Sequence, residues 1–232
     1  MTGALGVLGG MGPLASAHFI RTIYQLNCAD REQDMPRVLL DSDPGFPDRT
    51  TAIMNGEEEW ILRLLTSRVA GLIGLGATRI VVPCVTAHHF FARLEPALRA
   101  PIVSLVERTV RELAREPGPP LLMLSTSGTR RAGIFERAPG WPVVSDRVVL
   151  PSQADQEFVH HLIYQLKRGR RPAAALSEID ALRCRYDCAG VVVGCTEFHL
   201  VSQELAAAYG SGCAVDALRS IAEDIASVVI AR

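Results

Sequence analysis

Short runs of apolar, β-branched residues alternate with longer amphipathic segments along almost the whole chain. The runs RIVVP at 79–83 and GVVVG at 190–194 are nearly continuous in valine and isoleucine, which is typical of strands buried on both faces of a parallel sheet. Strands that alternate with helices form βαβ units, from which parallel sheets are built. The alternation predicts an α/β fold with mainly parallel sheets flanked by helices.

The same patterns predict the individual elements. Short segments in which apolar residues alternate with polar ones, or follow one another without interruption, indicate strands. Amphipathic segments with proline at the start or glycine at the end indicate helices. We expect strands at 4–9, 37–41, 79–83, 121–125, 141–145 and 190–194. We expect helices at 13–27, 57–76, 128–138, 153–169, 173–185 and 216–232.

Composition narrows the class of protein. The chain has 232 residues, of which 48% are hydrophobic and 21% charged, enough to bury a substantial core. The net charge of −1 gives no bulk attraction to nucleic acid or to an anionic membrane. No run approaches the ~20 apolar residues of a membrane span. Six cysteines do not make a disulfide scaffold, so we expect a reduced, cytoplasmic protein without nucleic-acid or membrane partners.

Two stretches of the sequence have nearly the same layout. VVPCVTAHHF at 81–90 and VVVGCTEFHL at 191–200 each carry valines, a cysteine, a threonine within two residues and a histidine four residues after the cysteine. Cys84 and Cys195 lie 111 positions apart, close to half the chain. This offset predicts two similar lobes with pseudo-two-fold symmetry and one cysteine each. We expect lobe one to comprise 1–98 plus 214–232, and lobe two 99–213.

The position of the two cysteines suggests chemistry. Ligands of parallel α/β sheets bind beyond the carboxyl ends of the strands, and both Cys84 and Cys195 follow such ends. A helix N-terminus there lowers a thiol pKa from its usual ~8.5. Two thiols that face each other can act as base and acid, one removing a proton from a carbon and the other returning it on the opposite face. The alternative for either residue alone is a small buried hydrophobe.

A metal site is the main rival for these residues. Cys84 with His88 and Cys195 with His199 form two C-x3-H pairs, which are suitable ligands for tetrahedral zinc. Structural zinc more often uses C-x2-C or H-x3-5-H spacing in small loops. We therefore favour the thiol chemistry and expect no metal.

The glycine-rich stretch GVLGGMGPLA at 6–15 also has two interpretations. Gly10, Gly12 and Ala15 fit the G-x-G-x-x-A pattern of a dinucleotide site, and Asp41 ends the next predicted strand. Met11 interrupts the pattern, and the acidic residue lies farther along than usual. The same loop could donate N–H groups to a substrate carboxylate, which we favour over an NAD-dependent oxidoreductase. Arg49 in PDRT and Lys167 in LKRGRR could hold a second carboxylate.

With these motifs assembled, the sequence resembles the cofactor-independent aspartate/glutamate racemase family, in particular its aspartate racemase branch. The resemblance rests on six motifs in order: GVLGGMGPLAS, DSDPGFPDRT, PCVTAHHF, LSTSGTRRAGIF, LKRG and GCTEFHL. It implies a two-lobed α/β fold with the active site between the lobes. It also implies stereoinversion by two thiols, no pyridoxal phosphate or other cofactor, a small carboxylate substrate and a homodimer.

The resemblance assigns roles position by position. Cys84 and Cys195 would be the two catalytic acid/bases. The glycine loop would line the site, the two cations would bind the side-chain carboxylate, and the threonines would position the α-carboxylate and the thiols. Glu197 matches the aspartate branch and would orient the substrate amine or a neighbouring group. The substrate-binding positions are Met11, Gly10, Gly12, Arg49, Val85, Thr86, Thr126, Lys167, Thr196 and Glu197.

One departure concerns the substrate. The family pattern after the first cysteine is Cys-Asn-Thr, whereas this chain has Cys84, Val85 and Thr86. Valine neither donates nor accepts a hydrogen bond, and a lost bond of this kind costs about 0.5–1.5 kcal/mol. We predict a racemase or isomerase of an acidic amino acid such as aspartate or glutamate. The alternatives are an isomerase of another small carboxylic acid and a non-catalytic binder of small acids.

Overall fold

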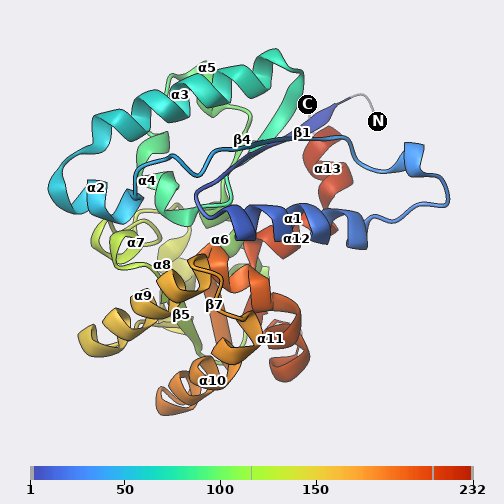
Figure 1. Ribbon diagram of the computed structural model, residues 1–232. Coiled ribbons are helices and arrows are strands. Elements are labelled where there is room, and N and C mark those ends of the chain that lie inside the picture. The colour runs from blue at the N-terminus through green and yellow to red at the C-terminus, as the bar shows by residue number, and fades with distance from the viewer. Residues whose placement is uncertain (1–2, 116, 211, 231–232) are drawn as a thin grey trace.

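The computed structural model of the chain describes residues 3–115, 117–210 and 212–230. It contains two four-stranded parallel sheets, each flanked by helices, in two lobes that lie one above the other in Figure 1. The predicted fold class, an α/β protein of two similar lobes, is confirmed. No helix within those ranges is both long enough and apolar enough for a membrane span.

The first sheet has the strand order β2-β1-β3-β4. Its strands are β1 (Ala4–Gly9), β2 (Val38–Ser42), β3 (Ala77–Val81) and β4 (Ile102–Val103). Every residue of β1 is buried, as expected for a central strand covered on both faces. Helix α1 (Pro13–Leu26) connects the neighbouring strands β1 and β2, and helix α3 (Glu58–Gly74) lies in the crossover from β2 over β1 to β3.

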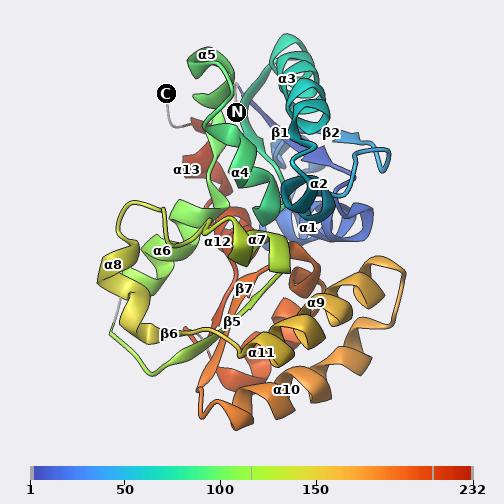
Figure 2. The same cartoon turned by 90° about the vertical axis from the view of Figure 1, so that its left-hand side faces the viewer.

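The second sheet repeats this arrangement with the order β6-β5-β7-β8. Its strands are β5 (Leu121–Ser125), β6 (Val148–Val149), β7 (Gly190–Gly194) and β8 (Ala214–Val215). Counted along the chain, the strands of both sheets follow the order second, first, third, fourth. The pseudo-symmetry predicted from the spacing of the cysteines is therefore present in the topology. Helices α9 (Gln153–Lys167) and α10 (Leu176–Arg185) cover this sheet on one side (Figure 2).

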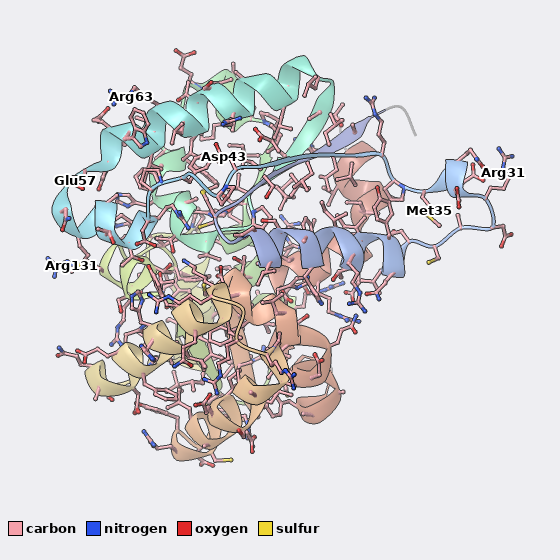
Figure 3. All side chains as sticks on the ribbon, viewed as in Figure 1. Arg31, Met35, Asp43, Glu57, Arg63 and Arg131 are labelled. Carbon is pink, nitrogen blue, oxygen red and sulfur yellow. The ribbon has the colours of Figure 1, made fainter. Side chains whose placement is uncertain are left out.

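Shorter elements complete the lobes. The segment between α1 and β2, which carries Arg31 and Met35, projects away from the body of the first lobe (Figure 3). The remaining elements are η1 (Glu32–Asp34), α2 (Arg49–Asn55), η2 (Val85–Ala87), α4 (His88–Phe91), α5 (Pro96–Arg99), α6 (Leu105–Arg115), α7 (Ser127–Arg131), α8 (Trp141–Val144), η3 (Ser145–Arg147), η4 (Pro172–Ala175), η5 (Thr196–Val201), α11 (Ser202–Tyr209), α12 (Ala217–Glu223) and α13 (Ile225–Ile230).

Two predicted elements are wrong. Residues 141–145 form the short helix α8 and the start of η3 instead of a strand, because Pro142 lies in the first helical turn and Gly140 precedes it with a φ of 81°. Proline suits a helix start and removes the donor that a strand needs. The helix expected at 128–138 ends at Arg131, and Gly133 with a φ of 57° turns the chain away from it.

The C-terminal segment also differs from its prediction. The helix expected at 216–232 is two helices, α12 and α13, separated at Asp224, and its last two positions lie outside the described residues. Strand pairing places β4 in the first sheet and β8 in the second, whereas the predicted boundaries put these two strands in the opposite lobes. We propose to draw the lobe boundaries just after β4 and just after β8.

The core joins the two lobes. One buried cluster belongs to the first lobe and packs α3 against its sheet, and a second packs α9 and α10 against the other sheet. The third cluster is shared, since Leu5 and Val81 of the first sheet and Met123 and Val192 of the second all belong to it. Helices α1, α6 and α12 lie between the two sheets (Figures 1 and 2).

A truncation in α3 tests this packing. Leu65 is fully buried, so Leu65→Ala is expected to lower the free energy of unfolding by about 2–5 kcal/mol. Leu75, just after the same helix, is 66% exposed, and Leu75→Ala is expected to change it by less than about 0.5 kcal/mol. Urea unfolding measures both variants. Equal losses would contradict the packing.

Candidate active site

The two predicted cysteines end equivalent strands. Cys84 follows β3 and begins η2, and Cys195 follows β7 and begins η5. Because parallel strands direct their carboxyl ends to one edge of the sheet, each lobe presents its cysteine at that edge. Both side chains are buried, with 6% and 5% of their surface exposed. They line the same cavity as residues from the start of α2, the start of α7 and the end of α9, three helices that lie where the two lobes meet in Figure 2.

Ten of the twelve predicted site residues line this cavity. Its free space is only about 10 Å³, which is close to the room needed by one water molecule, so the site is closed. Gly10 and Gly12 are absent from the lining. Sequence reasoning missed two residues, Asp48 and Thr50. The lining consists of Met11, Asp48, Arg49, Thr50, Cys84, Val85, Thr86, Thr126, Lys167, Cys195, Thr196 and Glu197.

Arg49 is a buried cation beside Cys84. Its Nη2 donates to the carbonyl of Met11 and its Nη1 to that of Pro47, each at 2.8 Å, while its buried Nε has no hydrogen-bond partner among the described residues. Burial lowers the pKa of Arg49, but the negative charges of Cys84 and Glu197, with that of Asp48, outweigh burial and raise the pKa overall. The guanidinium thus places a buried positive charge beside the sulfur of Cys84.

Cys195 has the opposite surroundings. Its Sγ–H donates to Oε2 of Glu197 at 2.9 Å. Burial, followed by the adjacent charge of Glu197, raises the pKa of Cys195 well above its usual range, so Cys195 is a protonated thiol at neutral pH. The sequence predicted that Glu197 would orient either the substrate amine or a neighbouring group. In the structure, the neighbouring group that Glu197 contacts is Cys195.

Hydroxyl groups connect the lobes next to each cysteine. Oγ1 of Thr86 lies 3.0 Å from Oγ1 of Thr126 and 3.0 Å from Oγ1 of Thr129. Thr126 also caps α7 by accepting from the N–H of Thr129. On the other side, Oγ1 of Thr196 donates to the carbonyl of Pro83 at 3.0 Å. The predicted threonines therefore lie at the lobe junction, together with Thr129, which sequence reasoning missed.

Lys167 is held through Asp48. Asp48 caps α2 by accepting from the N–H of Thr51, and it also accepts from the hydroxyl of Tyr164 at 2.6 Å. Nζ of Lys167 lies 3.9 Å from the same carboxylate and 4.5 Å from the centre of the Tyr164 ring. Burial raises the pKa of Asp48, but the hydrogen bonds and the two nearby cations outweigh burial and lower the pKa overall. A capping aspartate in PDRT was the available sequence signal.

The glycine loop supports the lining from behind. Gly10 has a φ of 87°, and a Cβ there would lie 2.1 Å from the carbonyl oxygen of Asp43, which Figure 3 labels. At Gly12 a Cβ would lie 2.1 Å from Oε1 of Glu197. Only glycine fits at Gly10, whereas a methyl group at Gly12 would displace the carboxylate of Glu197. The loop therefore positions Glu197 and, through the carbonyl of Met11, Arg49.

The histidines of the metal hypothesis are occupied elsewhere. His88 bonds to the backbone of Cys84 and Leu105, and His199 bonds to Asp216 and Thr22. Neither histidine is part of the cavity lining. Within the described part of the chain, no three or more His, Cys, Asp or Glu side chains are grouped as metal ligands.

A larger cavity lies elsewhere, between α4, β4 and the segment that follows α7. Its volume is about 570 Å³, and it contains neither Cys84 nor Cys195. Its walls are mainly apolar side chains such as Phe91, Ile102 and Ile134. By size alone, this larger cavity would be the candidate active site. The paired thiols and the charged side chains instead indicate the smaller cavity.

Removing the charge of Glu197 tests the state of Cys195. In Glu197→Gln the burial of Cys195 remains but the negative neighbour is lost, so the pKa of Cys195 should fall and its thiolate should form at lower pH. Iodoacetamide alkylation of Cys195, followed by mass spectrometry across pH, measures this. Glu204→Gln, an exposed change on α11, is the control. An unchanged Cys195 profile in Glu197→Gln would contradict the assigned contact.

A methyl group at Gly12 tests the support of Glu197. Gly12→Ala places its Cβ where Oε1 of Glu197 lies, so the carboxylate must move, and we expect turnover to fall at least about tenfold. Gly74→Ala at the end of α3, where a Cβ meets nothing within 4 Å, should leave turnover unchanged. Steady-state kinetics compares the two variants. Full turnover in Gly12→Ala would show that Glu197 needs no fixed position.

The chain is similar to known racemases in sequence and in fold. The sequence is 26% identical over 139 residues to the broad specificity amino-acid racemase RacX of Bacillus subtilis strain 168, covering 57% of this chain and 59% of that protein. The fold is similar to that of Picrophilus torridus aspartate racemase, with a TM-score of 0.83, 24% identity and coverage of 97% and 94% of the two chains. An aspartate racemase homologue from Pyrococcus horikoshii OT3 has a TM-score of 0.69 at 19% identity, with 98% and 99% covered.

The structural similarities show a shared fold, and a sequence match over most of the chain shows the family. The sequence model of the Asp/Glu/hydantoin racemase family matches residues 8–223. This range contains both cysteine-bearing loops, the glycine-rich stretch from residue 8 on and every residue that lines the cavity. The chain belongs to the Asp/Glu/hydantoin racemase family.

Proposed function

We propose that this protein is a cofactor-independent amino-acid racemase in which Cys84 and Cys195 exchange protons with the α-carbon of the substrate. The observation that carries the proposal is the pair of buried thiols in one cavity with opposite surroundings. Arg49 stabilises negative charge at Cys84, and Glu197 accepts the proton of Cys195 in a hydrogen bond. One base and one acid are thus ready at the same time.

The reaction proceeds in two proton transfers. The Cys84 thiolate removes the α-proton, so that the C–H bond breaks, an S–H bond forms and the electron pair is delocalised into the substrate carboxylate. The thiol of Cys195 then protonates the opposite face of the carbon and becomes a thiolate. The unpartnered Nε of Arg49 can donate to the side-chain carboxylate of the substrate. In the reverse direction, the raised pKa of Cys195 makes its thiolate the stronger base.

We propose an acidic amino acid, aspartate or glutamate, as the substrate. Arg49 and Lys167 supply two cations at the cavity, which suit a second carboxylate. Val85 adds an apolar wall where the family pattern has asparagine, and it is only 3% exposed. Because of this wall, the compounds tested as substrates should also include neutral amino acids and small acids without an amine. The name of the Bacillus subtilis relative, a broad specificity amino-acid racemase, supports this wider choice.

Exchange of the α-hydrogen tests the proposal. In D2O the wild-type protein should place deuterium at the α-carbon of the substrate as it inverts, and Cys84→Ser and Cys195→Ser should each abolish inversion because a serine hydroxyl is a far weaker acid. Cys28→Ser and Cys184→Ser, at exposed cysteines, should leave inversion unchanged. Mass spectrometry and chiral chromatography measure both quantities.

Two outcomes would contradict this function. Full inversion in both Cys84→Ser and Cys195→Ser would remove the two-thiol mechanism. Binding of an acid without any exchange would indicate a non-catalytic binder. The cytoplasmic location, the absence of a cofactor and the homodimer stay predictions, and gel filtration with light scattering tests the last.

A further inference from the structure

The C-x3-H spacing occurs twice, and the proposed reaction uses neither histidine. In the first lobe, Nδ1 of His88 lies 3.1 Å from the carbonyl oxygen of Cys84, and the N–H of Leu105 donates to Nε2 of His88 at 2.9 Å. A carbonyl only accepts and a backbone N–H only donates. One ring satisfies both bonds only as the neutral form with its proton on Nδ1.

The surroundings keep His88 in that form. Burial lowers the pKa of His88 to about 4, and the two hydrogen bonds fix both the proton and the orientation of the ring. Leu105 is the first residue of α6, which follows β4. His88 therefore ties the loop that carries Cys84 to the beginning of α6.

His199 makes the matching connection in the second lobe. Its Nδ1–H donates to Oδ2 of Asp216 at 2.5 Å, and Oδ1 of Asp216 accepts from the N–H groups of Leu218 and Arg219 at the start of α12. The Nε2 of the fully buried His199 ring lies 3.1 Å from Oγ1 of Thr22 in α1. His199 therefore ties the segment that begins at Cys195 to the beginning of α12.

The two connections are equivalent in the duplicated topology. Helix α6 follows β4 and helix α12 follows β8, and these two strands occupy the same edge position in their sheets. We propose that His88 and His199 are positioning residues that hold the thiols of Cys84 and Cys195 in place across the cavity. The proposal rests on the two-thiol function, because its purpose is to align both sulfur atoms with one carbon.

The difference between the connections predicts which thiol depends more on its histidine. His88 bonds to the carbonyl of Cys84 itself, whereas the bonds of His199 go to Asp216 and Thr22 and not to Cys195. Displacement of a reacting group by about 1 Å costs about 100-fold in rate. Loss of the His88 bond should therefore affect Cys84 most directly.

Two substitutions separate the nitrogens of His88. An asparagine amide nitrogen lies near the position of Nδ1, so His88→Asn keeps the donor to Cys84, and we expect kcat within about threefold of wild type. A glutamine amide lies near Nε2, so His88→Gln can keep the contact with Leu105 but loses the donor, and we expect kcat to fall more than about tenfold with KM within about twofold. His89→Gln, whose histidine bonds to Glu58 instead, is the matched control with unchanged kcat.

Alkylation of the thiols gives a readout that needs no turnover. With iodoacetamide at fixed pH, His88→Gln should change the rate at Cys84 more than about threefold, while the rate at Cys195 and the melting temperature stay as in wild type. His199→Gln, which loses the donor to Asp216, should change the rate at Cys195, and His199→Asn should preserve it. Because these rates do not depend on the substrate, they remain decisive if the protein inverts no amino acid.

The opposite results would overturn the inference. Equal kcat and equal Cys84 alkylation in His88→Asn and His88→Gln would show that the Nδ1 bond does not position the thiol. If kcat falls in His88→Asn but not in His88→Gln, the important contact of His88 is its bond to Leu105 at the start of α6 and not its bond to Cys84. Losses that follow the melting temperature in both variants would show a role in folding only.

Discussion

The apolar core shared by the two sheets determines where the cysteines meet. Residues of β1 and β3 belong to the same buried cluster as residues of β5 and β7, with α1, α6 and α12 between the sheets. A close-packed interior has low compressibility, so elements that share it are held in fixed positions relative to one another. The ends of β3 and β7, and with them Cys84 and Cys195, are therefore held on opposite sides of one small cavity.

The charged groups of the site, buried at Arg49 and Glu197 and half-buried at Asp48, each make at least one hydrogen bond. Arg49 donates to two backbone carbonyls and lies beside Cys84, Glu197 accepts from Cys195, and Asp48 accepts from Tyr164. Unpaired charges at this burial would cost several kcal/mol each. The same pairing gives the two thiols opposite surroundings, with a cation beside Cys84 and a carboxylate bonded to Cys195.

The closed state has a consequence for substrate entry. A free space of about 10 Å³ is smaller than any amino acid, so the residues around the cavity must move apart before a substrate enters. The polar contacts that join the lobes around the cavity include hydrogen bonds between Thr86 and Thr126, from Thr196 to Pro83 and from Tyr164 to Asp48, and the ion pair of Lys167 with Asp48. Such bonds can exchange with water at small net cost, whereas the shared core stays packed.

Sequence patterns predicted the elements best where burial alone decides them. The continuous runs of β1, β5 and β7 lie as predicted, since their periodicity reflects burial on both faces. The segment at 141–145 was predicted as a strand, because two valines outweighed the proline in the pattern. The two-residue strands β4 and β8 are too short to leave a periodic signal, and they exist only because a longer neighbour pairs with them.

The sequence by itself determined the α/β class, the repeat, the family resemblance and ten of the residues that line the cavity, because motifs and periodicity are local properties. Tertiary structure decided the partners. It placed Glu197 on Cys195, Asp48 beside Lys167, and Thr129 beside Thr86, and it assigned the two C-x3-H histidines to the starts of α6 and α12 instead of to a metal. Asp48 with Lys167 and Thr129 with Thr86 join side chains from different lobes, so no local pattern shows these pairs, whereas the contact of Glu197 with Cys195 is local but depends on the fold for its geometry.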